Sequence, residues 1–438
     1  LQTAACPAAS WSASGSRERQ RRFERCWNSL PREACAPNAF LRLAPLCMAS
    51  SSAPDAASST SPPTWPLLLP SVLALAALYA PQPLLPRWAL RYGRPETDLA
   101  LVISVALIPL AVTPLAAGAL LRRVPTASVL RGASALLGLA VAATAWPVPF
   151  VGLLALRVVQ GTAIAVLLTA LMTHIAQTRR GPARQTLMAA YVAATIAGGF
   201  LGRFLSGLTA SVASDSVFFL GLAALLLASD VGLRRLPVLS PPSPSAASQT
   251  TLPDLLRHGP VLRICAFVFG LFFVFSALMN FLPFRLQEIH PTASEGLTGA
   301  AYGGYLVGIV SSLGARRLID VLQHPRTAMA LGGGIVLMSL VVANGASVAM
   351  LIGSIAVLCA GFFLAHAIAA SRVSAVAPER ATNGSLVNGL YVSIYYTGGV
   401  LGAYLPGFVY DAYGWTAFLL LLGVLATGGM AALLVRRR

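Results

Sequence analysis

The sequence has no lysine and few charged residues of any kind. Only 10% of its 438 residues are charged, whereas about a quarter are charged in an ordinary soluble domain. All 31 basic residues are arginine, against 14 acidic residues, which gives a formal net charge of +17. With 56% hydrophobic residues, the composition excludes a disordered chain, and the shortage of charge excludes an ordinary soluble domain.

Sequence motifs of common catalytic and nucleotide-binding sites are also missing. There is no P-loop, no HExxH, no GxSxG and no CxxC cluster. Four of the six cysteines lie in the first 47 residues without metal-type spacing, and Cys265 and Cys359 lie in apolar runs. We therefore predict that the chain is not an enzyme, is not driven by ATP, and needs neither a cofactor nor a metal.

Long charge-free runs are what the sequence has instead. Runs of about 20 residues are long enough to span the ~30 Å hydrocarbon core of a bilayer. The sequence predicts an all-α membrane protein with twelve transmembrane helices at 65–86, 99–121, 132–156, 158–178, 185–202, 216–233, 264–284, 296–315, two within 327–371, 381–410 and 412–435. The two helices within 327–371 are expected to turn near 344–347.

The arginines mark the orientation. If both termini are cytoplasmic, the inner loops and helix flanks hold 18 arginines and the outer loops hold four. Such a bias follows the positive-inside rule, so the positive charge indicates membrane topology and not nucleic-acid binding.

Two segments differ in composition from the rest. Residues 1–64 form a predicted disordered tail, and Met48 is a possible natural start that would make residues 1–47 upstream sequence; a genuine cytoplasmic tail is the alternative. Residues 236–260 form a predicted cytoplasmic linker rich in proline and serine. It separates a six-helix half at 65–235 from another at 261–438.

The two halves repeat each other. Residues 191–207 recur as 391–407, with eight identities in 17 positions and an offset of 200. The same offset superposes Pro83 on Pro283 and Gly161 on Gly361. Two parallel six-helix repeats predict a site near the membrane midplane, with one half rocking against the other.

These motifs resemble the major facilitator superfamily. Arg157-x-x-Gln160-Gly161 is similar to a pattern associated with proton-coupled members, and Gly198-Gly199-x-x-Gly202 is similar to the glycine-rich antiporter motif. The loop after the second helix departs from the family, with Arg122 in place of an aspartate. A closer resemblance, to the bacterial YnfM-like inner-membrane transport proteins, rests on 360–366, 413–415, Asn280 and Gly202-Arg203.

Arg157 and Gln160 are the first candidate site residues. An arginine deep in a membrane helix costs at least ~2.5–3.5 kcal/mol unless it faces a wet cavity or a partner. Arg157 is expected to face the transport cavity, with bonding to backbone carbonyls as the structural alternative. Gln160 lies on nearly the same helix face, where it either orients substrate or ties helices together.

Three further residues are candidates for gating and proton coupling. Arg203 and Asp98 form a predicted outer gate pair, with Arg203 reaching the membrane interface as the alternative. His366 is the expected proton carrier, because histidine changes charge near neutral pH and no acid occupies the middle of a helix. A helix–helix hydrogen bond is its structural alternative, and Asp98 is the second candidate for coupling.

The remaining candidates are neutral. Gln82, Asn280, Tyr391 and Tyr395 are expected to line a cavity suited to neutral or amphiphilic solutes. Two sets of glycines are expected to be surfaces where helices pack closely: Gly198, Gly199, Gly202, Gly398, Gly399 and Gly402.

The predicted function is secondary active transport of a small organic solute across a bacterial inner membrane, coupled to protons by antiport and directed outward as efflux. Uptake or facilitated diffusion on the same fold is one alternative, and a non-transporting membrane sensor or scaffold is another. The expected partners are the substrate, protons and the lipid bilayer, and the chain is expected to be a monomer.

Overall fold

The computed structural model of the chain describes residues 64–121, 123–239, 252–375 and 384–434. The predicted tail with Met48, the variant motif residue Arg122 and the middle of the predicted linker lie outside these ranges. Every regular element in the described part is a helix. The all-α prediction is therefore confirmed for this part of the chain.

The helices fall into two consecutive groups. The first comprises α3 (Trp65–Tyr79), the short helix η3 (Gln82–Leu84), α4 (Leu85–Tyr92), α5 (Glu96–Leu121), α6 (Thr126–Ala143), α7 (Phe150–Thr178), α8 (Gly181–Val212) and α9 (Asp215–Leu233). The second comprises α10 (Leu252–Arg257), α11 (Gly259–Ile289), α12 (Glu295–Ala301), η4 (Tyr302–Gly304), α13 (Tyr305–Leu322), α14 (Pro325–Ala343), α15 (Val348–Ala375), α16 (Gly384–Tyr404) and α17 (Pro406–Leu434).

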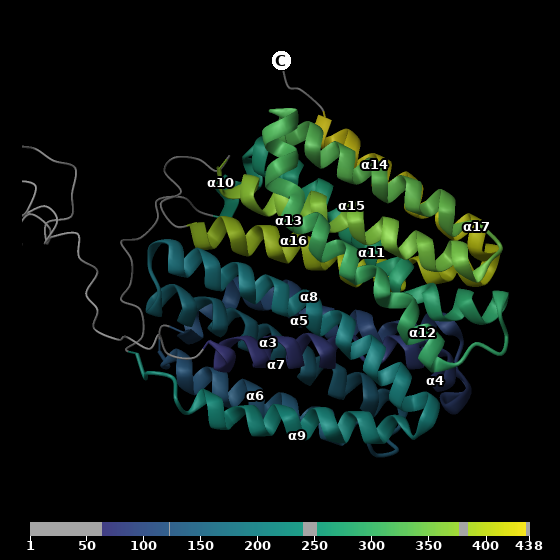
Figure 1. The fold of residues 1–438 in the computed structure, drawn as a ribbon, viewed down its shortest axis with the longest axis horizontal. Helices are drawn as coiled ribbons and strands as arrows, with labels where there is room; N and C mark the ends of the chain where they lie inside the picture. Colours follow the sequence, from purple (N-terminus) through teal and green to yellow (C-terminus); the bar gives the residue numbers. More distant parts are fainter. Residues whose placement is uncertain (1–63, 122, 240–251, 376–383, 435–438) are drawn as a thin grey trace, which may run out of the picture. The chain divides into compact units, whose positions relative to one another are not determined.

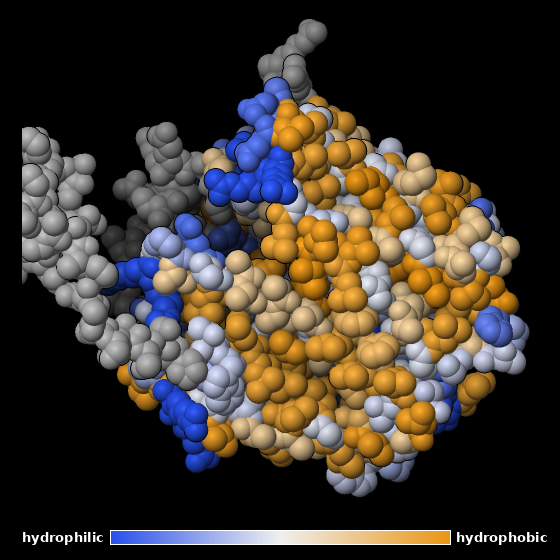
Figure 2. Space-filling model, in the orientation of Figure 1, coloured by the Kyte–Doolittle hydropathy of each residue, from blue (hydrophilic) through white to orange (hydrophobic). Residues whose placement is uncertain are grey.

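Many of these helices suit a bilayer. Within the described residues, ten segments are long and apolar enough to cross a membrane. Figure 2 shows apolar atoms over most of the visible face, with hydrophilic residues gathered at its edges. The prediction of twelve spans also counted 296–315 and 381–410, where the structure has α12, η4 and α13, and α16.

Two predicted helix boundaries are wrong. The charge-free run 132–156 is not one helix, because α6 ends at Ala143 and α7 begins at Phe150, so that Arg157 lies inside α7. The turn between them contains Trp146 and two prolines, and proline stops a helix without adding any charge to the sequence.

The second error concerns the last two helices. The predicted break at residue 411 lies inside α17, while the preceding helix ends at Tyr404 and α17 starts at Pro406. A further kink occurs at Gly414, whose φ of 77° favours glycine.

Each group packs mainly with itself. In the first, α3 contacts α8 and α9, and α7 contacts α5 and α6; in the second, α15 contacts α13 and α14, and α11 contacts α16 and α17. We call the two groups the first and second bundles. Figure 1 shows the first bundle, purple to teal, below the second, green to yellow. The bundles meet where α5 contacts α16 and where α8 contacts α12 and α13.

Candidate functional site between the two bundles

Arg157 is enclosed within the first bundle, and only 1% of its surface is exposed. Its Nε donates to the carbonyl oxygen of Val102 over 2.9 Å. Nη1 donates to the carbonyl of Ala77 over 3.1 Å and to Oε1 of Gln160 over 2.6 Å, and Nη2 donates to the carbonyl of Leu78. All three nitrogens therefore have oxygen partners, and the side chain ties α7 to α3 and α5.

The end of α3 explains why the carbonyl of Ala77 is available. In a continuous helix the carbonyl of Ala77 would bond to the amide of residue 81, but Pro81 has no N–H. Arg157 supplies the missing donor, and Nε2 of Gln160 extends the link to the carbonyl of Ala140 over 2.9 Å. This is the geometry of the structural alternative for both residues; their role in transport stays a prediction.

Arg203 lies between the bundles and is 0% exposed. Its Nε donates to Oε1 of Gln82, and its Nη1 donates to the carbonyl of Gly199 over 2.6 Å. The guanidinium group also lies over three tyrosine rings, 4.0 Å from that of Tyr79 in α3, 5.1 Å from Tyr302 and 4.6 Å from Tyr305. The two last tyrosines belong to the second bundle, so Arg203 spans the interface.

Asn280 of α11 continues this polar group across the interface. Its Oδ1 accepts a hydrogen bond from Gln82 over 3.4 Å. Its Nδ2 donates to the carbonyls of Ala100 in α5, over 3.3 Å, and Ala403 in α16, over 3.0 Å. The predicted cavity residues Gln82 and Asn280 are thus brought together with Arg203.

His366 lies in a separate, aromatic part of the second bundle. Its Nδ1 is 3.1 Å from the hydroxyl of Tyr391. Its ring stacks on Phe362 at 5.8 Å and lies 4.7 Å from the ring of Tyr395. The structure therefore groups the three predicted residues His366, Tyr391 and Tyr395.

A chain of aromatic rings connects the two groups. Tyr305 meets Phe275 at 5.7 Å, Phe275 stacks on Phe362 at 4.0 Å, and Phe362 stacks on His366. Along it the residues change from buried at Tyr305 to half-buried at His366. A continuous series of rings thus leads from Arg203 at the interface to His366 inside the second bundle.

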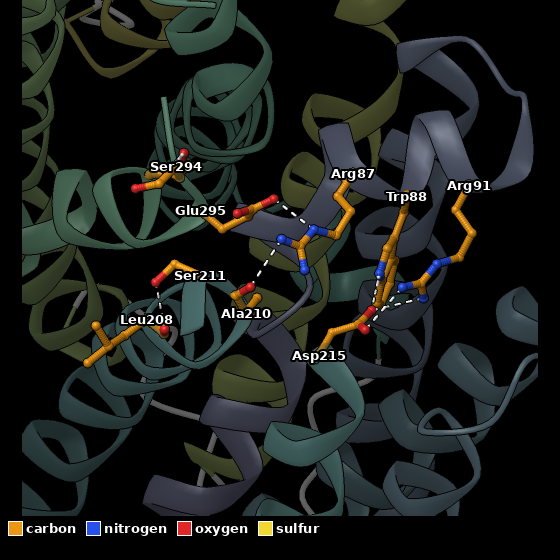
Figure 3. Close-up of polar contacts among 10 residues, drawn as sticks. Arg87, Trp88, Arg91, Leu208, Ala210, Ser211, Asp215, Ser294 and Glu295 are labelled. Atoms are coloured by element: carbon orange, nitrogen blue, oxygen red, sulfur yellow. Dashed lines mark hydrogen bonds and ion pairs between the residues drawn. The ribbon is translucent and has the colours of Figure 1, made fainter. Parts of the chain in front are cut away.

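Polar contacts at one end of the molecule join the bundles. Nε of Arg87 in α4 forms an ion pair with Glu295 at the start of α12, 2.7 Å away, as Figure 3 shows. Thr97 donates to Asp411 over 2.6 Å, and Ser104 donates to the carbonyl of residue 400 over 2.8 Å. We call this end the closed end. It lies away from the first residue of α3, Trp65, and from the last residue of α17, Leu434.

Nearby, within the first bundle, Asp215 has two partners. Trp88 Nε1 donates to its carboxylate over 2.7 Å, and Arg91 forms an ion pair with it at 2.9 Å (Figure 3). These bonds fix α4 against the start of α9, so that Arg87 is held in place toward α12.

The predicted gate pair is not made in this structure. Asp98 lies 3.5 Å from Arg94 in an i,i+4 pair, while Arg203 bonds to Gln82 and Gly199. The reason is depth, since Asp98 is in the first turn of α5 whereas Arg203 lies about 13 Å from the end of α8 at 1.5 Å per residue. Arg203 is also fully buried within the protein, which differs from the surface-exposed position that the alternative assumed.

The repeated glycines lie where helices approach closely. A Cβ on Gly198 or Gly202 would overlap the backbone of α3, at residue 72 or residue 76. A Cβ on Gly398 or Gly402 would overlap the backbone of α11, at residues 269 and 273. At Gly199 and Gly399 the nearest atoms are side chains, those of Arg203 and Tyr305 in one case and of Phe272 in the other.

Several residues of the interface were not predicted from the sequence. They lie in apolar runs or loops and belong to no motif: Tyr79, Phe275, Arg87 and Glu295. His174 was also missed: it is 1% exposed, its Nδ1 is 2.8 Å from the hydroxyl of Thr126, and its Nε2 has no partner among the described residues. A search for histidine in every predicted span would have found it.

Known proteins share both the sequence pattern and the fold. The sequence profile described as Major Facilitator Superfamily matches residues 67–388. The chain belongs to this superfamily.

An uncharacterized MFS-type transporter of Bacillus subtilis (strain 168), YybF, is 25% identical over 370 residues, which cover 81% of this chain and 90% of the relative. An uncharacterized transporter of Buchnera aphidicola subsp. Schizaphis graminum is 24% identical over 376 residues, covering 82% of this chain and 88% of the relative.

Solved structures of transporters have a similar fold. A mutant of the nucleoside transporter NupG has a TM-score of 0.68 and 14% identity, over 84% of this chain and 99% of that one. A bacterial homologue of the human lysosomal transporter Spinster, in an inward-facing and unoccupied conformation, has a TM-score of 0.66 and 11% identity, over 84% and 94%.

Membership of the Major Facilitator Superfamily settles the broad function. The chain is a multi-pass membrane transporter of a small-molecule substrate and not an enzyme. The resemblance to the superfamily is therefore confirmed, and the finer resemblance to the YnfM-like group stays a prediction.

Proposed function

We propose that this member of the superfamily is a secondary active transporter that moves a small organic solute by alternating access. The observation that carries the proposal is the interface between the bundles, where Arg203, Gln82 and Asn280 meet tyrosines from both sides. Polar side chains buried between two largely apolar bundles are typical of a substrate path.

The full proposal takes up the predictions from the sequence. The protein then has twelve spans in two halves with a repeat offset of 200, and both termini lie in the cytoplasm of a bacterium. It belongs to the inner membrane and is related to the YnfM-like group. On this orientation the closed end faces outward, and the conformation is inward-facing. The exposed faces of the first turns of α8 and the last turns of α13 support an opening at the opposite end.

We propose that transport is directed outward, as efflux, and that it is coupled to protons. His366 is the proposed proton carrier, because it is half-buried, bonds to Tyr391 and lies on the aromatic chain that leads to Arg203. Asp98 is the alternative, and its partly exposed position in the first turn of α5 makes it easier to reach from solvent but remote from Arg203.

Proteoliposomes with an imposed pH gradient test this function. Purified protein is reconstituted, a library of small organic solutes is offered, and movement of each solute is followed with and without the gradient. We expect at least one solute to accumulate on the side with the lower pH, because an antiporter exchanges it against protons. Movement that ignores the gradient would indicate facilitated diffusion, and no movement of any solute would favour a sensor.

A further inference from the structure

Two arginines are fully buried among the residues that the structure describes, and they use their nitrogens differently. Every nitrogen of Arg157 donates to an oxygen. Arg203 uses Nε and Nη1, but its buried Nη2 has no hydrogen-bond partner among the described residues. A buried donor without a partner loses its hydration and gains nothing in exchange. Each nitrogen of the Arg157 guanidinium group therefore has a hydrogen-bond partner, whereas one nitrogen of the Arg203 group has none.

The charge of Arg203 is also uncompensated. Within the part of the chain that the structure describes, other arginines form ion pairs with acidic residues, but Arg203 forms none. Its polar partners are neutral, and the rings of Tyr79, Tyr302 and Tyr305 add cation–π attraction. Charged side chains inside a membrane protein pair with one another or with backbone carbonyls. Arg203 has one carbonyl partner, that of Gly199, and a free Nη2, so an anion from a ligand would complete its partners.

The free nitrogen lies on the edge of the guanidinium group that suits a carboxylate. Nε and Nη2 point the same way, and a carboxylate can accept from both at once. In this structure, Oε1 of Gln82 accepts a hydrogen bond from Nε but not from Nη2. Rotation of the Gln82 amide would open both donors to one ligand.

The surroundings indicate the rest of the ligand. Tyr79 and Gln82 come from the first bundle, and Tyr302 and Tyr305 come from the second, so separation of the bundles uncovers this edge. Tyr305 continues into the rings of Phe275 and Phe362. Flat apolar surfaces next to a cation suit an organic acid with a planar body.

We propose that Arg203 binds the carboxylate of a small organic acid, whose apolar body packs on the tyrosines at the interface. This inference rests on the proposed transport function, since it names the substrate class of the same interface. It also departs from the neutral or amphiphilic solutes that the sequence suggested. Arg157 is then a structural residue, and Arg203 is the binding residue.

The first test is thermal unfolding of the purified protein in detergent without added solute. Arg203→Met removes a buried charge with one free nitrogen and leaves one side-chain acceptor, Oε1 of Gln82, without its donor, so the unfolding temperature is expected to fall less than in Arg157→Met. Arg157→Met is the matched control, and it should lower that temperature because it leaves backbone carbonyls without a donor. An equal loss in both variants would make Arg203 structural and overturn the proposal.

The second test measures binding with matched pairs of an acid and its neutral amide, from acetate and acetamide to benzoate and benzamide. We expect at least one acid to raise the unfolding temperature of the unaltered protein, at concentrations at least tenfold below those its amide needs. Arg203→Met should abolish this shift. Arg234→Met, which alters an exposed ion pair with Asp230, should retain it.

Three results would overturn the acid site: no acid that stabilises the protein, amides that act as well as acids, or acids that still act on Arg203→Met. Each of them is compatible with transport of another solute. Conversely, absence of transport in proteoliposomes would overturn the proposed function while the binding result stood, so the two failures are distinguishable.

Discussion

At the scale of single residues, the buried polar side chains differ in what satisfies them. Arg157 is held by backbone oxygens, Arg203 by neutral oxygens and rings, and His366 by one tyrosine hydroxyl. Because histidine, unlike arginine, can gain and lose a proton in the ordinary pH range, His366 is the group whose role a pH gradient can test.

We expect His366→Gln to keep substrate binding and exchange but to lose accumulation driven by a pH gradient. Its transport should also depend less on pH than that of the unaltered protein, because glutamine cannot bind a proton in place of the histidine. The measurement is gradient-driven accumulation and counterflow on the same vesicles.

Tyr391→Phe is the control for His366, because it removes the hydrogen bond and leaves the titratable ring. If the histidine only ties helices together, Tyr391→Phe should impair transport and His366→Gln, which conserves a polar group, should not. His174→Gln should leave coupling intact; loss of accumulation in that variant would transfer the proton role to α7.

At the scale of elements, the break between α3 and α4 is the local feature with the widest consequences. Pro81 ends the hydrogen-bond ladder of α3, and Arg157 replaces the missing donor from a neighbouring helix. The break also places Gln82 in a short helix at the interface, where it meets both Arg203 and Asn280.

We expect the cost of losing Arg157 to depend on Pro81. Arg157→Met alone should destabilise the protein by about 1–3 kcal/mol for the buried carbonyls that it leaves unpaired. Adding Pro81→Ala restores an amide to residue 81, so the double variant should lose less than the sum of the two single variants. Thermal unfolding of all four proteins measures this, and strict additivity would show that the two residues are not coupled.

The close approach of α8 to α3 predicts a second effect at this scale. Gly202→Val places a side chain against the backbone at residue 76, and we expect a loss of about 1–3 kcal/mol or failure to fold. Gly221→Val in α9 is the control, because open space surrounds that position. Equal unfolding temperatures for the two variants would contradict the packing role.

At the scale of the whole molecule, the contacts at the closed end are where the two bundles are joined by polar groups near the surface. The ion pair of Arg87 and Glu295 joins the bundles, and both side chains are partly exposed, at 33% and 19%. Such a pair contributes about 1 kcal/mol or less, enough to change a two-state ratio up to about fivefold.

Glu295→Gln is therefore expected to raise the population that is open at the closed end. The measurement is the distance distribution between spin labels at Leu90 and Thr292, which are both exposed and lie on opposite bundles. Asp230→Asn is the control, since Asp230 pairs with Arg131 at the same 2.7 Å but within the first bundle. An unchanged distribution in Glu295→Gln would show that other contacts hold this end closed.

The sequence by itself determined the class of fold, because crossing a bilayer depends on the hydropathy of each segment and not on its neighbours. It also predicted the turn at 344–347, where polar residues interrupt a long apolar run, and the structure has that turn between α14 and α15. It misplaced the turns before Phe150 and before Pro406, because apolar residues and proline form those turns and no charge marks them.

Only the tertiary structure decided which polar groups meet. Asp98 and Arg203 are both charged and both in the half of their helix near the same end, yet depth and neighbouring carbonyls separate them. Arg203 finds Gln82 and three tyrosines from both bundles, and no local pattern links those positions. The physical reason is that a buried charged side chain can bind only the groups that lie at the same level of the helix bundle. Which groups lie there depends on how the helices pack.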